Sequence, residues 1–132
     1  VHAAVLEARK SGIVLTARAD GLGKGAYDLD EVLRRLSAFA EAGADVVYAP
    51  GLPDLEAIRT VCASVPVPVN HVIGQGATGL SFDQLADAGV RRISLGGSFT
   101  RAALNAINTL GQTIAAGDFT SLDAAPAWSR LC

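Results

Sequence analysis

Four short aliphatic runs recur along the chain, and each is followed by a segment with the spacing of an amphipathic helix. A strand–helix–strand connection within one sheet is right-handed and leaves its two strands parallel. The repeat therefore predicts an α/β fold with a parallel sheet and no antiparallel hairpins. We predict its strands over residues 13–17, 45–49, 65–72 and 90–95.

Capping residues indicate where the helices between these strands begin. Asp28 with Glu31 and Ser81 with Gln84 have the spacing of capping boxes. Pro53 fits the first position of a helix, where a missing N–H costs nothing. The predicted helices cover residues 3–10, 28–42, 53–63, 81–88 and 99–116, with a loop and one short helix around Trp128 after them.

The length of the chain decides between two parallel architectures. With 132 residues and 50% hydrophobic composition, it can form one domain with a core. Four strands fit either a small doubly wound domain or part of an eight-stranded barrel, which needs about 250 residues. The chain contains no Met and opens inside a helical segment. We therefore expect a gene product that begins upstream, with residues 1–132 forming one partial domain. That domain is predicted to be the C-terminal half, about strands five to eight, of a (β/α)8 TIM-type barrel.

Charge and composition exclude several classes of partner. The formal net charge is −2, so no broad basic surface is expected for nucleic acid or acidic lipid. No apolar run approaches the roughly 20 residues of a membrane span. Cys62 and Cys132 form neither a disulfide framework nor a metal-ligand spacing. These features predict a cytoplasmic protein that binds a small molecule.

Polar residues gather where the predicted strands end, which is the functional edge of a parallel fold. Arg18 and Asp20 follow the first strand. The Arg18 guanidinium could clamp a carboxylate or phosphoryl group through two parallel hydrogen bonds. Alternatively, Arg18 and Asp20 pair with each other and only hold the loop. Their position leaves both alternatives open.

Asn70 and His71 end the third predicted strand. Because strand side chains alternate between faces, only one of the two can point to the barrel axis. Asn offers a donor and an acceptor to a polar ligand, whereas a lone His at such a position is more often structural. We therefore predict Asn70 as the inward residue.

Glycines mark the remaining strand ends. Gly51 follows the second strand, and Gly97 precedes the last long helix, where backbone amides could bind an anion or simply form a tight turn. Residues 21–26 match the dinucleotide pattern G-x-G-x-x-A, but no acidic residue closes the second strand to hold a ribose. A mobile loop that shields the site is the better explanation of this segment.

Three motifs together resemble the isocitrate lyase/phosphoenolpyruvate mutase superfamily, particularly its phosphonomutase-like branch. They are Leu-Thr-Ala-Arg-Ala-Asp at 15–20, Ala-Gly-Ala-Asp-Val-Val-Tyr-Ala-Pro-Gly-Leu at 42–52, and Pro-Val-Asn at 68–70. The segment Gly-Val-Arg-Arg-Ile-Ser-Leu-Gly at 89–96 fits the same family. The resemblance covers nearly the whole chain in order.

This resemblance implies Mg²⁺-dependent C–C or P–C bond chemistry on a small 2-oxo or phosphono acid. It places Arg18 on the family arginine that binds carboxylate or phosphoryl oxygens, and Asn70 on a polar position at the end of strand seven. Together with Asp20, Gly51 and Gly97, these residues form the predicted substrate site. The family's metal ligands and catalytic loop come from strands two to four, so no metal ligand is named here and no catalytic residue is assigned.

One departure separates this chain from the family pattern. The end of strand six usually carries Glu or His, whereas Pro50 stands there and cannot transfer a proton. Pro50 therefore leaves the exact reaction open. The alternative to an enzyme is a non-catalytic half barrel that binds an anion or only assembles with a partner. Either way, we expect a homo-oligomer or association with the missing half of the barrel. Residues 1–132 alone are expected to show no Mg²⁺-dependent turnover.

Overall fold

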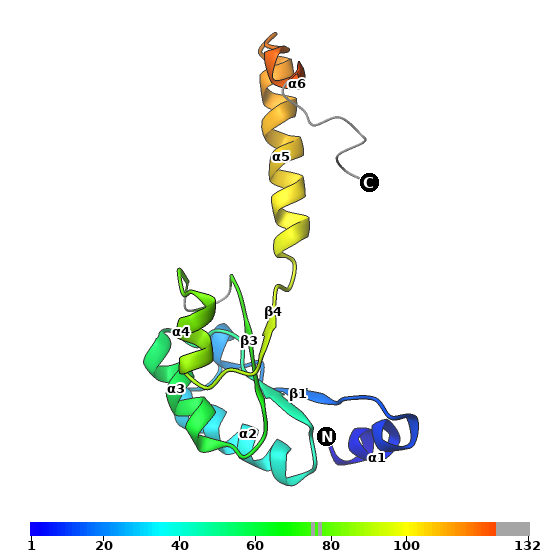
Figure 1. Cartoon of the computed structure of the whole chain (residues 1–132), viewed down its shortest axis with the longest axis vertical. Coiled ribbons are helices and arrows are strands. Elements are labelled where there is room, and N and C mark those ends of the chain that lie inside the picture. Colours follow the sequence, from blue (N-terminus) through cyan, green and yellow to red (C-terminus); the bar gives the residue numbers. More distant parts are fainter. Residues whose placement is uncertain (75, 77, 124–132) are drawn as a thin grey trace. The chain divides into compact units, whose positions relative to one another are not determined.

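The computed structural model describes residues 1–74, 76 and 78–123. The chain divides into two compact units, Val1–Gly96 and Gly97–Cys132. In the first unit, helices and strands alternate along the chain (Figure 1). Its elements are α1 (His2–Ser11), β1 (Thr16–Arg18), the 3₁₀ turn η1 (Leu22–Lys24), α2 (Leu29–Glu41), β2 (Val46–Tyr48), α3 (Leu55–Ser64), β3 (Val69–Val72), α4 (Phe82–Asp87) and β4 (Arg92–Ser94).

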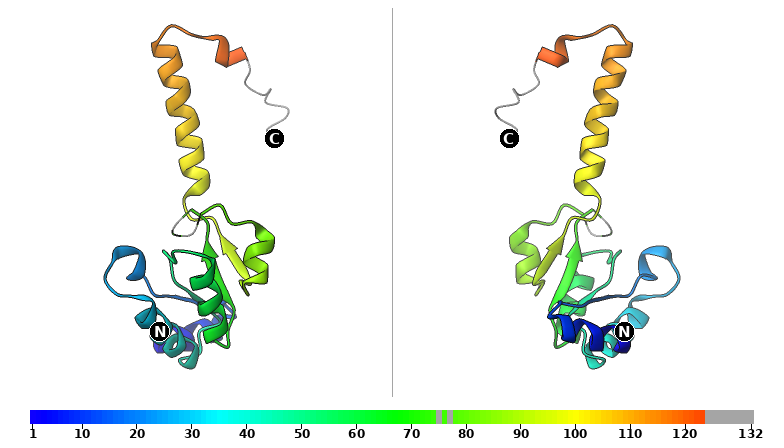
Figure 2. Two further views of the ribbon diagram at one scale, coloured as in Figure 1. Left: turned by 90° about the vertical axis from the view of Figure 1, so that its left-hand side faces the viewer. Right: turned by 90° about the vertical axis from the view of Figure 1, so that its right-hand side faces the viewer.

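The four strands form one sheet in the order β1-β2-β3-β4, with every neighbouring pair parallel. Figure 2 shows them side by side, and α2, α3 and α4 connect each strand to the next. The predicted parallel α/β sheet is therefore confirmed.

Several predicted boundaries are wrong at the strands. Ile13 and Val14 precede β1 and are 63% and 67% exposed, so residues 13–17 are not one buried strand. Pairing to the β2 side begins only at Leu15, whose carbonyl accepts from the amides of Asp45 and Val46. The third strand begins at Val69 rather than at residue 65, because the prolines before it cannot donate to a ladder. The fourth is confined to Arg92–Ser94.

The predicted helix starts are partly correct. Ser81 and Gln84 form the expected capping box, and Asp28 caps α2 by accepting from the Glu31 amide. Glu31 itself does not complete a second box, because its carboxylate binds arginines on α2. Pro53 is not the first helical residue, since the Asp54 side chain caps α3.

One face of the sheet carries the core. Strand residues at alternate positions, such as Ala17 and Val47, pack with helix residues such as Val32, Leu36 and Ile58. The full set of buried residues in this cluster is Ala17, Ala19, Val32, Leu36, Ala44, Val47, Ala49, Leu52, Ala57, Ile58, Val61, Val65, Val69, Leu85, Ala88 and Val90. The residues between them along each strand therefore point to the other face.

The second unit contains α5 (Ser98–Ala115) and α6 (Thr120–Asp123). No residue of α5 is buried, although Phe99, Leu104 and Ile107 are large and apolar. The short helix predicted around Trp128 lies outside the described residues. Across the described part of the chain, no helix combines the length and apolarity that crossing a membrane requires.

Candidate functional site

A row of polar side chains crosses the sheet on the face opposite the helical core. Arg18 is in register with Tyr48, Tyr48 with Asn70, and Asn70 with Arg92. Residues in register on parallel strands point to the same face. With neighbouring strands about 4.8 Å apart, Arg18 and Asn70 lie roughly 10 Å apart along the sheet. We call these four residues the polar row.

Arg18 stands at the last position of β1 and its side chain is 57% exposed. Its Nε lies 3.5 Å from Oδ1 of Asp20, whereas Lys24 Nζ donates to Oδ2 of Asp20 at 2.6 Å. Charge-assisted hydrogen bonds are usually shorter than 3 Å, so Lys24 is the main partner of Asp20. The Lys24 hydrogen bond and the Arg18 charge lower the pKa of Asp20, although some desolvation opposes them. The predicted internal pair exists but does not occupy the Arg18 guanidinium.

Tyr48 lies between Arg18 and Asn70 in the polar row and is partly buried. Burial raises the pKa of its phenol, which the Arg18 charge lowers and the Asp20 charge raises further. The hydroxyl therefore stays protonated near neutral pH and can donate a hydrogen bond.

Asn70 is only 1% exposed and has two partners on β4. Its Oδ1 accepts from Arg92 Nη1 at 2.7 Å, and its Nδ2 donates to Ser94 Oγ at 3.0 Å. The buried amide is therefore satisfied within the sheet rather than by an open cavity.

His71 follows Asn70 on β3, so its side chain points to the opposite face of the sheet, and it is 2% exposed. It is in register with Ile93, which packs against the core. Its two ring nitrogens have no hydrogen-bond partner among the described residues. Burial lowers the pKa of the imidazole, so His71 is neutral at pH 7.

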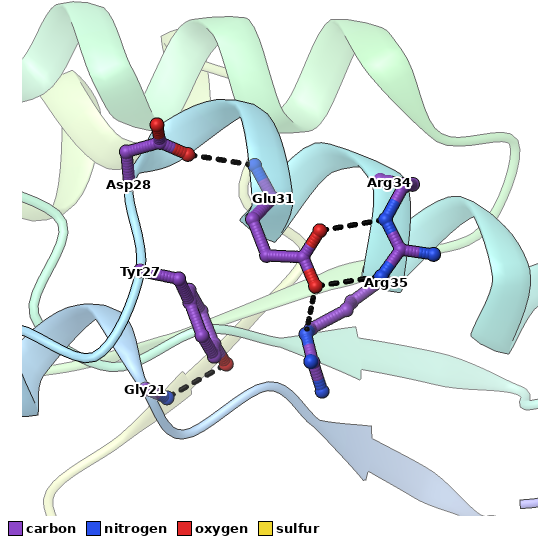
Figure 3. A network of polar contacts seen from close by, with 6 residues as sticks. All are labelled: Gly21, Tyr27, Asp28, Glu31, Arg34 and Arg35. Carbon is purple, nitrogen blue, oxygen red and sulfur yellow. Dashed lines mark hydrogen bonds and ion pairs between the residues drawn. The ribbon is translucent and has the colours of Figure 1, made fainter.

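The glycine-rich segment after β1 is fastened to α2 (Figure 3). Gly21 donates its buried amide to Tyr27 Oη at 2.7 Å, and the Arg35 guanidinium lies 4.7 Å from the Tyr27 ring centroid. The Glu31 carboxylate accepts hydrogen bonds from Arg34 at 2.6 Å and from Arg35 at 2.7 Å. The hydrogen bond from Arg34 is the largest cause of a pKa of Glu31 lowered to about 2, and the one from Arg35 adds to it. This chain of contacts holds the loop that carries Asp20.

We expect Tyr27→Phe in the intact protein to lower the free energy of unfolding by about 1–3 kcal/mol. The change removes the acceptor of a buried amide and leaves that donor unsatisfied. Chemical denaturation measures the loss, and hydrogen exchange at Gly21 should accelerate. Tyr48→Phe is the control, because the Tyr48 hydroxyl makes no hydrogen bond with the residues that the structure describes. An equal loss in both variants would contradict the proposed role of Tyr27.

Three glycines bring successive loops into contact at the carboxyl edge of the sheet. Gly51 has φ +87°, and a Cβ there would lie 2.5 Å from Gly23 Cα. Gly76 has φ +81°, and a Cβ there would meet the Leu52 carbonyl oxygen. The loops after β1, β2 and β3 thus pack backbone against backbone, and this is where the structure places the predicted site residue Gly51.

Gly97 is the N-cap residue of α5, with no side-chain cap and with φ −87°. Gly97 belongs to the second unit, whereas Arg18, Asp20, Asn70 and Gly51 lie in the first, and the substrate-binding role of all five stays a prediction.

The described residues do not fit a magnesium ion. No group of three or more His, Cys, Asp or Glu residues among them is placed to hold a metal. Mg²⁺ requires several oxygen ligands. Asp20, the carboxylate beside the polar row, already faces Lys24 and Arg18.

Sequence reasoning named Arg18 and Asn70 but missed Tyr48, Arg92 and Ser94. The signal for the β4 residues was present. Arg92-Ile93-Ser94 alternates polar, apolar and polar, which is the pattern of a strand with one polar face. Tyr48 carried no comparable signal, since only the register places it beside Arg18.

The fold and the polar row define a parallel α/β domain with cationic and amide side chains on the face of its sheet opposite the helical core. The family model described as phosphoenolpyruvate phosphomutase matches residues 1–115. The chain belongs to this family, within the phosphoenolpyruvate mutase/isocitrate lyase superfamily. A comparison with curated protein sequences found no match.

Solved structures give the same family. A Burkholderia cenocepacia J2315 protein designated a lyase/mutase is 42% identical, with a TM-score of 0.91, over 98% of this chain and 48% of that one. A protein of the same organism designated a phosphonomutase is 33% identical, with a TM-score of 0.71, over 85% of this chain and 47% of that one. 2,3-Dimethylmalate lyase, a superfamily member, is 28% identical, with a TM-score of 0.71, over 86% of this chain and 41% of that one.

The chain therefore spans about half the length of the barrel-type structures it matches. The expected fold class, a parallel α/β unit equal to half of such a chain, is confirmed. A phosphonopyruvate hydrolase structure with bound oxalate and Mg²⁺ is 25% identical over 90% of this chain and 44% of that one, with a TM-score of 0.62. One relative thus binds Mg²⁺, whereas the described residues of this chain form no metal site.

Proposed function

We propose that the intact protein is a cytoplasmic, Mg²⁺-dependent lyase or phosphonomutase-like enzyme. It acts on a small 2-oxo, carboxylic or phosphono acid by making or breaking a C–C or P–C bond. The observation that carries this proposal is the polar row, which sets Arg18, Tyr48 and Asn70 in register on the face of the sheet opposite the helical core. The names of the matched enzymes support the reaction class.

In this proposal Arg18 binds an anionic group of the substrate. Its guanidinium is exposed, and its nearest carboxylate is already bound by Lys24. Tyr48 adds a hydroxyl donor beside it. A planar fork and a neighbouring hydroxyl hold a carboxylate or phosphonate in one orientation.

The metal would stabilise negative charge that develops on the substrate. Its ligands would come from outside the described residues, so no step is assigned to it here. The residues of this chain bind and orient the anion, and the loop braced by Tyr27 and Gly51 keeps the edge of the site in place.

The proposal is tested on the intact protein with phosphonopyruvate and 2,3-dimethylmalate as candidate substrates, with Mg²⁺ and with a chelator. Turnover that requires Mg²⁺ supports it. Binding of these acids without turnover would favour the second candidate, a non-catalytic anion-binding protein. Pro50 is the observation that favours this candidate, because it lies in the turn two residues after β2 and has no group that can transfer a proton.

We expect Arg18→Lys to weaken transition-state binding even though the charge is retained. A point charge replaces a planar fork, so one of two aligned hydrogen bonds is lost. The expected loss in kcat/KM corresponds to about 1–3 kcal/mol. Arg59→Lys on α3 is the matched control, because Arg59 lies outside the polar row and contacts Glu56 at 3.9 Å. An unchanged kcat/KM in Arg18→Lys would contradict substrate binding by Arg18 and leave it only the structural role of pairing with Asp20.

A further inference from the structure

We infer that Arg92, at the start of β4, is a second anion-binding residue of this site, and that Asn70 positions it. This inference rests on the proposed function, because it adds a residue to the same substrate site. It changes the role expected for Asn70, which then acts on the substrate through Arg92.

The register places Arg92 on the right face. Asn70 is in register with Arg92, as Tyr48 is with Asn70 and Arg18 with Tyr48. Ile93, the next residue of β4, packs against the helical core, so Arg92 points away from the core. The polar row therefore has a guanidinium on each outer strand of the sheet.

Hydrogen bonds fix the direction of the Asn70 amide. Asn70 is 1% exposed and donates from Nδ2 to Ser94 Oγ, which turns its Oδ1 toward Arg92 Nη1 at 2.7 Å. An amide flipped the other way would set its NH₂ group against a guanidinium, which has donors only. Asn70 thus holds the guanidinium without neutralising it.

The charge of Arg92 is uncompensated within the described part of the chain. No carboxylate there lies within ion-pair distance of its guanidinium, whereas Arg18 contacts Asp20 and Arg35 contacts Glu31. A guanidinium has five N–H donors, and the bond to Asn70 uses one of them. Arg92 is exposed, so its remaining donors can bind an anion in the bidentate manner.

Arg91 provides a matched comparison. It has the same charge one position earlier, but its Nη1 donates to the carbonyls of Ala86 and Val90. It also lines an apolar pocket between α4 and β4 with Phe82 and Ile93. Arg91 therefore belongs to the helix side of the sheet, and its loss controls for a general change in charge.

The test measures oxalate binding to the intact protein by titration calorimetry in the presence of Mg²⁺. We expect Arg92→Gln to weaken binding by about tenfold to a hundredfold, the effect of losing charge-assisted hydrogen bonds. Arg91→Gln should change it by less than about twofold. Arg92→Lys keeps the charge and should show an intermediate loss, and it replaces Arg92→Gln if thermal unfolding shows that the latter is not folded.

Arg18→Gln separates the two proposals. If Arg18→Gln weakens oxalate binding and Arg92→Gln does not, the inference is overturned and the proposed function stands. If the unsubstituted protein binds no oxalate but turns over phosphonopyruvate or 2,3-dimethylmalate, the inference is overturned and the proposed function stands. If it shows neither binding nor turnover, both are overturned. Equal losses in Arg91→Gln and Arg92→Gln also overturn the inference, because the effect would then be one of net charge.

The positioning role of Asn70 is tested by a double-mutant cycle. If Asn70 acts through Arg92, Asn70→Ala combined with Arg92→Gln should bind oxalate no more weakly than Arg92→Gln alone. Additive losses would show that Asn70 contacts the ligand itself. A purely structural role would lower thermal stability and leave the affinity of the folded protein unchanged.

Discussion

Gly51→Ala is expected to destabilise the intact protein by about 2–5 kcal/mol in the free energy of unfolding. The backbone of Gly51 has φ +87°, a region that costs an L-residue roughly 1–2 kcal/mol. A Cβ would also lie 2.5 Å from Gly23 Cα and 2.9 Å from Gly23 N. These are backbone atoms that cannot rotate away, so one loop must move, at a further cost of roughly 1–3 kcal/mol.

Two other glycines separate these contributions. Gly12 has φ +64° with nothing within 4 Å of a Cβ, so Gly12→Ala should show the backbone cost alone, about 1–2 kcal/mol. Gly23 lies on the other side of the same contact, but its Cβ would meet the Pro50 carbonyl oxygen at 3.4 Å, an ordinary distance. Gly23→Ala should therefore change stability by less than about 1 kcal/mol.

Chemical denaturation of the three variants measures this order. Equal losses in Gly51→Ala and Gly12→Ala would mean that the loops after β1 and β2 are not in contact. Because the first of these loops carries Asp20 and Lys24, we also expect Gly51→Ala to weaken substrate binding where the variant still folds. The role that the structure supports for Gly51 is thus to let two loops meet beside the polar row.

The order of elements was predictable because its signals are local. Aliphatic runs separated by caps such as Ser81 with Gln84 specify strands and helices within a few residues of chain. The extent of each strand was not predictable in this way. Ile13 and Val14 have strand-forming side chains, but a strand also needs a neighbour, and the β2 segment that pairs with β1 covers only Val46–Tyr48.

The candidate site also divides into residues that local sequence indicates and residues that only strand pairing brings together. Arg18 and Asn70 could be named from the sequence because each follows an apolar run and matches a family motif. Tyr48 and Arg92 also lie in segments that resemble the family, but only the lateral register of the strands places them in one row with Arg18 and Asn70. The Glu31 side chain shows the reverse error, since its spacing from Asp28 suits a capping box but Arg34 and Arg35 bind its carboxylate instead.

The other large effect concerns assembly. We expect residues 1–132 expressed alone to form dimers or larger assemblies, because several apolar surfaces remain uncovered. Along α5, Phe99, Leu104 and Ile107 are 76%, 59% and 66% exposed, and the helix buries no residue. In the first unit, β1 and β4 are the outer strands of the sheet, and each leaves one row of backbone groups open to pairing.

Light scattering coupled to gel filtration measures the mass, and binding of a hydrophobic dye reports the exposed apolar surface. Ile107→Glu should increase the monomer fraction, because it places a charge on the exposed apolar surface of α5. Asn105→Glu is its control, since it adds the same charge at a position that is already polar and exposed. A monomer that unfolds cooperatively and binds no dye would mean that the four-stranded unit is closed in isolation. That result would contradict the assembly prediction, because the open edges of β1 and β4 and the exposed apolar residues of α5 would then be stable in water without a partner.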